Sequence, residues 1–250
     1  MYQEILKQKI DLGLRKPFKK QTREKIQKLN DMDYIYGAMS LEGMAYSRKE
    51  IETMMQGEMP KEASLKECVL VKNYMNTLEL TRDLLSLKNS LDKRLLLKLH
   101  SSLTGKTTGF RKTNPVMEEF DYTPPDHSEV ESGLNKIFQV AYKSGSNVIH
   151  SASRIHCGIL ALHPFDTYSE VMARMAMNYY LEEKGFLPVA LGYNYKEYTK
   201  TMIECLKDRD DVLFFWGLER AVYNKLTQVI QIVETDEAEA EAAEPEGTWK

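Results

Sequence analysis

Two adjacent helices that are apolar on most of their sides place the strongest constraint on how this chain can fold. One face of the first carries only apolar residues at helical spacing: Val148, Ala152, Ile155, Ile159 and Leu162. Pro164 ends this helix, because a proline ring disfavours helical backbone in the residue before it. The second helix has two neighbouring apolar faces and stops at Gly185. A helix with two apolar faces is buried on both, so the pair predicts the centre of a helical domain.

Helical periodicity also dominates the rest of the chain. We expect further helices over residues 1–13, 21–36, 48–55, 61–87, 91–103, 127–143, 195–207 and 211–233. The one extended stretch, residues 110–125, has the composition of a loop or hairpin. The sequence contains no repeat and no second core. It therefore predicts one all-α domain with a short β-hairpin flap, built from N-terminal helices over 1–90 and a core over 91–233.

An acidic tail accounts for the net charge of -3. Residues 234–250 carry seven acidic residues against Lys250, and the remainder of the chain has 33 basic and 30 acidic residues. That balance is too weak to indicate nucleic-acid binding. Because the tail has almost no apolar residue to bury and repels itself, we expect it to be disordered. A solvating role is favoured over a partner-binding motif.

The sequence also limits which cellular compartment and which metal sites are compatible with this chain. No apolar run approaches the ~18 residues of a membrane span, and the N-terminus lacks the pattern of a signal peptide. Cys68, Cys157 and Cys205 are too far apart for a C-x-x-C metal site and form no disulfide framework. We therefore expect a cytoplasmic protein with reduced thiols and with no membrane or nucleic-acid partner. His156 and His163 lack the i, i+4 spacing of a helical metal site, so no metal site is predicted.

The segment that joins the two central helices is HPFDTYSEVMAR, residues 163–174, and it resembles a known signature. That signature, HPFx[D/E]GNGRxxR, belongs to the Fic (filamentation-induced-by-cAMP, or Fido) family, and it aligns here without a gap. The resemblance extends roughly over residues 97–206 and includes LKLHSSL, GFRKTNPVM and YTPPD upstream of the signature. It implies the helical Fic fold and a transferase that moves AMP, or another phosphate-linked group, to a protein hydroxyl.

A second resemblance lies upstream, within residues 34–44. The sequence IYGAMSLEGMAYSRKEI, which begins at Ile35, resembles the inhibitory helix [S/T]-x-x-x-E-[G/N] of some Fic proteins. Glu42 and Gly43 match this pattern, and Ala38 replaces the Ser or Thr. The resemblance implies that Glu42 pairs with Arg174 and keeps it from the γ-phosphate of a nucleotide. An ordinary buried ion pair between two helices is the other interpretation.

The transfer of such a group needs side chains that this chain has partly lost. His163 is kept and suits a base that takes the hydroxyl proton, although a helix-end residue in a polar network is the favoured interpretation. Thr167 stands where a carboxylate would hold Mg²⁺, and Val171 where an arginine would meet phosphate. Tyr168 and Glu170 replace two glycines, and Glu170 competes with an anion for the N-terminus of the second helix. We therefore expect little ordinary AMP transfer.

Three functions stay open from the sequence. The first is a Fic-fold binding or regulatory module that acts on a protein partner and lacks ordinary AMP-transferase activity. The second is an autoinhibited transferase in which His163 is the base and Ser169, Arg174 and Tyr198 hold the nucleotide. The third is a helical interaction scaffold. The cofactor is unknown, with ATP and magnesium expected if the protein is active, and a homo-oligomer is compatible with all three. Asp166 could reach a metal ion if the loop is remodelled.

Overall fold

The computed structural model describes residues 1–143, 147–208 and 210–243, and ten α-helices make up most of this part of the chain. The helices are α1 (Tyr2–Leu14), α2 (Lys20–Leu41), α3 (Arg48–Met55), α4 (Leu65–Ser86), α5 (Lys93–Thr104), α6 (Val130–Ala141), α7 (Val148–Leu162), α8 (Ser169–Glu183), α9 (Tyr195–Asp208) and α10 (Val212–Ala243). Two 3₁₀ helices, Glu118–Phe120 and His127–Glu129, precede α6. The predicted all-α class is confirmed.

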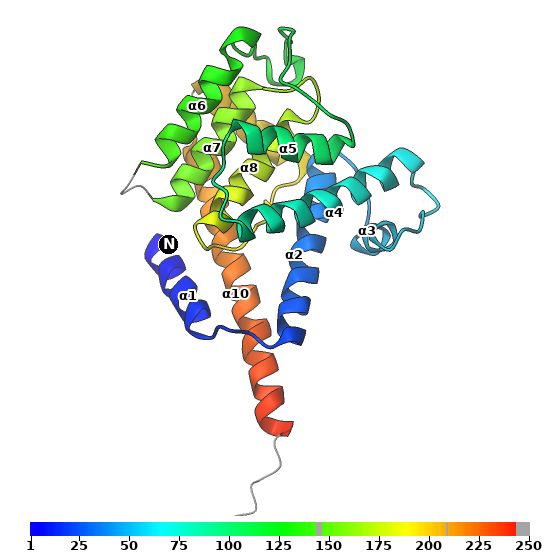
Figure 1. The fold of residues 1–250 in the computed structure, drawn as a ribbon, viewed down its shortest axis with the longest axis vertical. Coiled ribbons are helices and arrows are strands. Elements are labelled where there is room, and N and C mark those ends of the chain that lie inside the picture. The colour runs from blue at the N-terminus through cyan, green and yellow to red at the C-terminus, as the bar shows by residue number, and fades with distance from the viewer. Residues whose placement is uncertain (144–146, 209, 244–250) are drawn as a thin grey trace, which may run out of the picture.

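The two helices expected at the centre, α7 and α8, lie there (Figure 1). α7 begins where the Asn147 side chain accepts hydrogen bonds from the backbone N–H groups of Ile149 (2.9 Å) and His150 (3.3 Å). In α8 every residue from Ser169 to Leu181 except Glu170 is buried. α6 packs on α7, and α4 and α5 pack on α8, which explains why these two helices are apolar on more than one face.

Helix α2 is longer than the periodicity indicated, and its C-terminal end contains the segment that resembles an inhibitory helix. Ala38, Met39 and Leu41 are buried in its last turns, and Glu42 is the C-cap residue. α2 contacts α3, α4 and α10. Glu42 therefore lies at the junction between the N-terminal helices and the core, in a position fixed by the packing of a helix of 22 residues.

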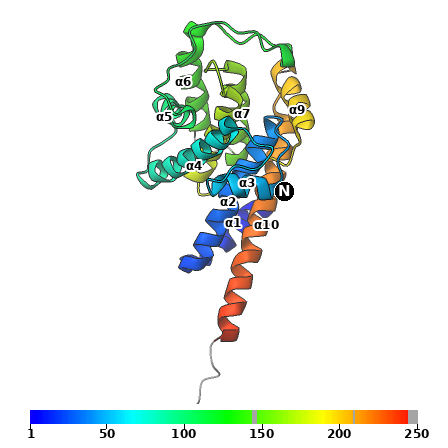
Figure 2. The same cartoon turned by 90° about the vertical axis from the view of Figure 1, so that its right-hand side faces the viewer.

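The structure differs from the expected disorder of residues 234–250 over the first part of that tail. α10 continues to Ala243 and projects beyond the other helices (Figures 1 and 2). Arg15 pairs with Glu234 (3.0 Å) and Glu237 (2.7 Å), and Lys25 pairs with Asp236 (2.7 Å). These cations come from the other end of the chain and offset the repulsion between the acids. Residues 244–250 lie outside the described part.

The flap, residues 110–125, contains less sheet than the predicted hairpin. Within the described residues its strand pairing is one antiparallel bridge between Met117 and Tyr122, with N–H···O distances of 2.9 and 3.2 Å. A 3₁₀ turn fills the space between them, and Asp121 takes a left-handed conformation (φ 46°). Pro115 and Pro124 cannot donate to a ladder, which limits the pairing to this bridge.

No helix in the described ranges is both long and apolar enough to cross a membrane.

Candidate functional site

The loop that connects α7 to α8, residues 163–168, holds two non-glycine residues in left-handed conformations. His163 has φ 43° and ψ 65°, and its N–H still donates to the carbonyl of Ile159 (2.9 Å), so it caps α7. Tyr168 has φ 63° and begins α8. A side chain in this region costs about 1–2 kcal/mol of strain that glycine does not incur. Tyr168 thus has a backbone conformation that glycine adopts without strain, at a position where the Fic signature has glycine.

Ser169 closes this connecting loop from within. Its hydroxyl accepts a hydrogen bond from the N–H of Phe165 (2.9 Å) and donates one to the carbonyl of the same residue (3.0 Å). Ser169 is fully buried. The sequence suggested that this position could present an N–H group to a nucleotide, but in this conformation the residue is covered.

His100 on α5 supports the connecting loop from outside, a role that sequence reasoning missed. Its ring stacks on Phe165 with the centroids 3.8 Å apart. Its Nε2 lies 2.9 Å from the carbonyl oxygen of Thr167, and its Nδ1 lies 2.8 Å from the hydroxyl of Thr108. Burial lowers the pKa of His100, so the ring is neutral at pH 7. Because a carbonyl only accepts, Nε2 carries the proton and Nδ1 accepts from Thr108.

Arg111 ties the flap to the end of α7 and was also missed. It is 2% exposed, and its Nε–H donates to the carbonyl of His163 (2.7 Å) while its own backbone N–H donates to that of Pro164 (2.9 Å). Its Nη groups donate to the carbonyls of Thr113 (2.7 Å) and Pro125 in the flap. The partners are mostly backbone oxygens, which have no sequence signature; only the resemblance of GFRKTNPVM to the family could have indicated Arg111.

His163 is mostly covered, and a carboxylate stands beside it. Nδ1 of His163 is buried without a hydrogen-bond partner among the described residues, and Oε1 of Glu170 lies 3.7 Å from it. The pKa of His163 is lowered to about 4, mainly by burial and also by the charge of Arg111, while the charge of Asp166 opposes the shift. The imidazole is therefore neutral at pH 7 and can accept a proton, but it is a weak base.

Arg174 on α8 forms an ion pair with Glu42 at the end of α2, as the resemblance implied. Arg174 is 4% exposed, and its guanidinium carbon lies 5.3 Å from the ring centroid of Tyr198 on α9. The hydroxyl of Tyr198 lies 3.0 Å from Nε2 of the buried His156. Nε and Nη1 of Arg174 have no hydrogen-bond partner within the described ranges. Two donors therefore remain for an anion, but Glu42 already balances the charge.

The substituted positions of the signature have taken other places in the structure. Val171 is fully buried, and the Thr167 carbonyl is used by His100. Tyr168 lines a cavity of about 600 Å³ between α4, α5 and the connecting loop. Asp166 is exposed and accepts a hydrogen bond from the hydroxyl of Thr113 (3.1 Å).

These residues do not fit a magnesium-bound triphosphate as they stand. Within the described ranges there is no group of three His, Cys, Asp or Glu residues that could hold a metal ion. The structure brings His163 next to Glu170 and joins Arg174, Glu42 and Tyr198 in a second cluster. A weak neutral base and a cation already paired by a carboxylate can bind or orient a group, but they offer no second cation for a leaving pyrophosphate.

Comparison with known proteins gives one family match. The sequence model described as Fic/DOC family matches residues 90–181, a range that contains the connecting loop and Arg174. No curated protein sequence matches the chain.

Solved structures match over nearly the whole chain at low identity. A Fic domain containing signaling protein from Bacteroides thetaiotaomicron has a TM-score of 0.78 at 14% identity and covers 94% of this chain and 98% of its own. Fic-1 (residues 134–508) from C. elegans has a TM-score of 0.77 at 18% identity, covering 94% and 73%. A Fic family protein from Desulfovibrio desulfuricans has a TM-score of 0.74 at 14% identity, covering 92% and 74%. Residues 90–181 therefore match the Fic/DOC family, and the chain has the Fic fold.

Proposed function

We propose that this Fic-fold protein is a binding or regulatory module without ordinary AMP-transferase activity, and that its partner is another protein. The observation that carries the proposal is the position of Glu170 in the first turn of α8. Its carboxylate oxygen Oε1 lies 3.7 Å from Nδ1 of His163, the candidate base. A phosphate charge about 4 Å from a carboxylate is repelled by about 4 kcal/mol at an effective dielectric constant near 20. That repulsion corresponds to about a thousandfold loss of affinity.

The missing cation adds to this effect. Val171 is buried where the Fic signature has its first arginine, so this position supplies no cation to a phosphate. The remaining arginine, Arg174, is engaged by Glu42. Losing one preorganised donor to developing charge typically costs on the order of 10² to 10³ in rate. The combined losses support a protein that no longer turns over ATP in the usual way.

Calorimetry with ATP and Mg²⁺, together with a label-transfer assay, tests this proposal. We expect no saturable ATP binding to the wild-type protein and no labelled protein product. Micromolar binding of ATP with Mg²⁺, together with self-labelling that His163→Ala abolishes, would reject the proposal. His127→Ala, a histidine on the exposed 3₁₀ helix before α6, is the matched control for that variant.

An autoinhibited transferase is the second candidate, and the pairing of Glu42 with Arg174 favours it. In this alternative Glu42 blocks an arginine that otherwise grips a phosphate-linked donor, and His163 takes the proton of a protein hydroxyl. Glu42→Gly should then produce labelling with some donor, and adding His163→Ala should remove it. Glu58→Gly removes an exposed carboxylate after α3 and should change nothing. A blank donor screen with Glu42→Gly excludes this alternative.

A cytoplasmic location and a homo-oligomer stay predictions. The three cysteines are free thiols in the structure.

A further inference from the structure

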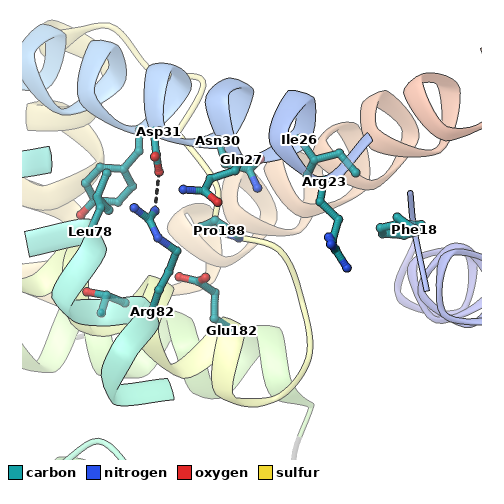
Figure 3. A pocket seen from close by; sticks show the side chains of 12 residues that line it. Phe18, Arg23, Ile26, Gln27, Asn30, Asp31, Leu78, Arg82, Glu182 and Pro188 are labelled. Carbon is teal, nitrogen blue, oxygen red and sulfur yellow. Dashed lines mark hydrogen bonds and ion pairs between the residues drawn. The ribbon is translucent and has the colours of Figure 1, made fainter. Parts of the chain in front are cut away.

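A cavity of about 190 Å³ lies where α2, α4 and α8 meet, apart from the connecting loop (Figure 3). Polar side chains line its inner part: Asn30, Asp31, Tyr34, Arg82 and Glu182. In Figure 3 the Glu182 carboxylate points from α8 toward Arg82, which comes from α4 and pairs with Asp31 on α2. The three helices thus turn a set of hydrogen-bonding groups toward one cavity that is partly open to solvent.

Two of these groups lack partners. Oδ1 of Asn30 and the hydroxyl of Tyr34 are buried and have no hydrogen-bond partner within the described ranges. Tyr34 is only 6% exposed. The carboxylate of Glu182, a partly buried residue, lies in the same cavity. The pKa of Glu182 is raised to about 7, mainly by burial, with the charge of Arg82 opposing the shift and that of Asp31 reinforcing it. An unsatisfied buried polar group costs about 1–3 kcal/mol, so two such groups and a carboxylate around one cavity call for an occupant.

The surplus groups are hydrogen-bond acceptors. The cation of Arg82 is already balanced by Asp31 at 2.7 Å, and Arg23 is exposed at one end of the cavity beside Phe18 (Figure 3). Asn30 Oδ1 and an ionised Glu182 can only accept, and a tyrosine hydroxyl can do either. A complementary ligand must therefore supply several N–H donors and a positive charge.

The remaining walls are apolar and set the size of the ligand. Phe18, Ile26, Leu78 and Pro188 line the cavity between the polar groups. An apolar cavity of about 150 Å³ accommodates a benzene molecule. The cavity here is larger, so it has room for such a ring with a short polar substituent.

We propose that this cavity binds a small primary amine with a compact apolar body, with its ammonium group between Glu182 and Asn30 and its apolar part against Leu78 and Pro188. The ammonium group donates to both acceptors and neutralises the carboxylate, and the ring displaces water from the apolar walls. The site needs neither His163 nor Arg174, so it stands whether or not the protein is a transferase.

Calorimetry with benzylamine and benzyl alcohol tests the proposal on the wild-type protein. The two probes have nearly the same shape, and only the amine carries a charge. We expect one saturable benzylamine site, and benzyl alcohol binding weaker by at least about 10-fold, because hydrogen bonds to charged groups contribute about 1.5–3 kcal/mol. Equal binding of the two probes, or no saturable benzylamine binding, overturns the proposal.

Glu182→Gln keeps the shape of the side chain and removes the charge. It should weaken benzylamine at least about 10-fold and leave benzyl alcohol unchanged. Glu79→Gln removes one carboxylate from the exposed face of α4 and should bind benzylamine as the wild type does. If Glu182→Gln matches Glu79→Gln, the amine does not sit at Glu182 and the assignment is wrong.

The pH dependence supplies a test that needs no variant. The charged groups facing Glu182 are Asp31 from α2, Arg82 from α4 and Arg23 at the rim. The ammonium group prefers the ionised carboxylate. The affinity for benzylamine should therefore decrease as the pH is lowered, while benzylamine itself stays protonated. With a pKa of about 7 for Glu182, the ionised fraction drops by about 30-fold between pH 8 and pH 5.5. Benzylamine affinity that does not change over this range contradicts an ion pair with Glu182.

Discussion

Removing the carboxylate of Glu42 should destabilise the protein markedly. The Arg174 side chain is 5% exposed and that of Glu42 is 24% exposed, so the substitution Glu42→Ala leaves a buried guanidinium without its counter-charge. Nε and Nη1 of Arg174 already lack partners within the described ranges, so no nearby acceptor in that part of the chain takes over. Breaking one side of a buried pair costs about 3–5 kcal/mol.

Partial exposure of Glu42 reduces that figure, because water reaches one end of the pair. We therefore expect the free energy of unfolding to fall by about 2–4 kcal/mol. For a chain of this size each kcal/mol lowers Tm by about 2–4 °C, so Glu42→Ala should lower it by about 4–16 °C. Urea unfolding followed by circular dichroism gives the free energy directly, provided the m-value matches that of the wild type.

A double-mutant cycle isolates the pair. Arg174→Met fills a similar volume without charge, and in the double variant with Glu42→Ala much of the lost stability should return, because no unpaired charge remains. Glu79→Gln, which removes an exposed carboxylate, should stay within about 0.5 kcal/mol of the wild type. If Glu42→Ala itself falls within that range, the guanidinium is hydrated or paired elsewhere and the reasoning fails.

Three further outcomes follow from the structure. Arg111→Lys should cost about 2–3 kcal/mol and make residues 112–124 more sensitive to protease, because lysine cannot reach the several carbonyls that the guanidinium joins. The ring signals of His163 in NMR spectra should stay those of the neutral form from pH 8 to pH 6; because its pKa is lowered to about 4, the unfolded chain binds more protons, and stability should decline as pH drops from about 6.5 toward 4. Lys88→Gly should raise the free energy of unfolding by about 1 kcal/mol, because exposed Lys88 has φ 56° after α4.

Most of the helices could be predicted because their signals are local. Ser47 and Glu50, three positions apart, form a capping box at the start of α3, with the Ser47 N–H 2.8 Å from the Glu50 carboxylate. Ser64 and Glu67 form the same kind of capping box, and α4 begins at Leu65. This local signal indicates a later start than the residue 61 expected from periodicity.

The end of α2 was harder to predict, because a glycine there has a packing role. Gly37 lies inside the helix, where a Cβ atom would meet the Cβ of Ala190 at 3.0 Å. Glycine in a helical pattern is usually taken as a weak point or a stop. Here it allows close approach of the segment after α8, a contact between residues far apart in the sequence.

The helical part of the acidic tail was also hard to predict, because its charge partners lie far away in the sequence. The acids of residues 234–237 are repulsive when considered alone, and their partners Arg15 and Lys25 lie more than 200 positions away. Each exposed pair stabilises by only about 0.2–1 kcal/mol. Since α10 already packs on α1 through contacts such as Gln8 with Thr227 (2.7 Å), these small terms extend a helix that is held by other means.

The candidate site separates two sets of residues with different physical roles. His100 and Arg111, which lie outside the signature, hold the connecting loop through its backbone and through Phe165. Ser169 holds the loop from within, at a position where the signature has asparagine. They fix the loop strongly enough that Tyr168 keeps a left-handed conformation at a cost of about 1–2 kcal/mol. The frame of the loop is thus stabilised independently of the groups that meet phosphate.

Because the frame and the chemistry rest on different residues, the chemistry can be lost without loss of the fold. Val171 gains burial where a phosphate-facing arginine would need solvent or a ligand, and Glu170 stands at a helix N-terminus, which stabilises a carboxylate. Both substitutions favour the folded state and oppose phosphate binding. The pairing of Glu42 with Arg174 acts in the same direction, since it neutralises the remaining cation while joining α2 to α8. Stability and nucleotide binding therefore make opposite demands on these positions, and at each of them the residue present is the one that stability favours.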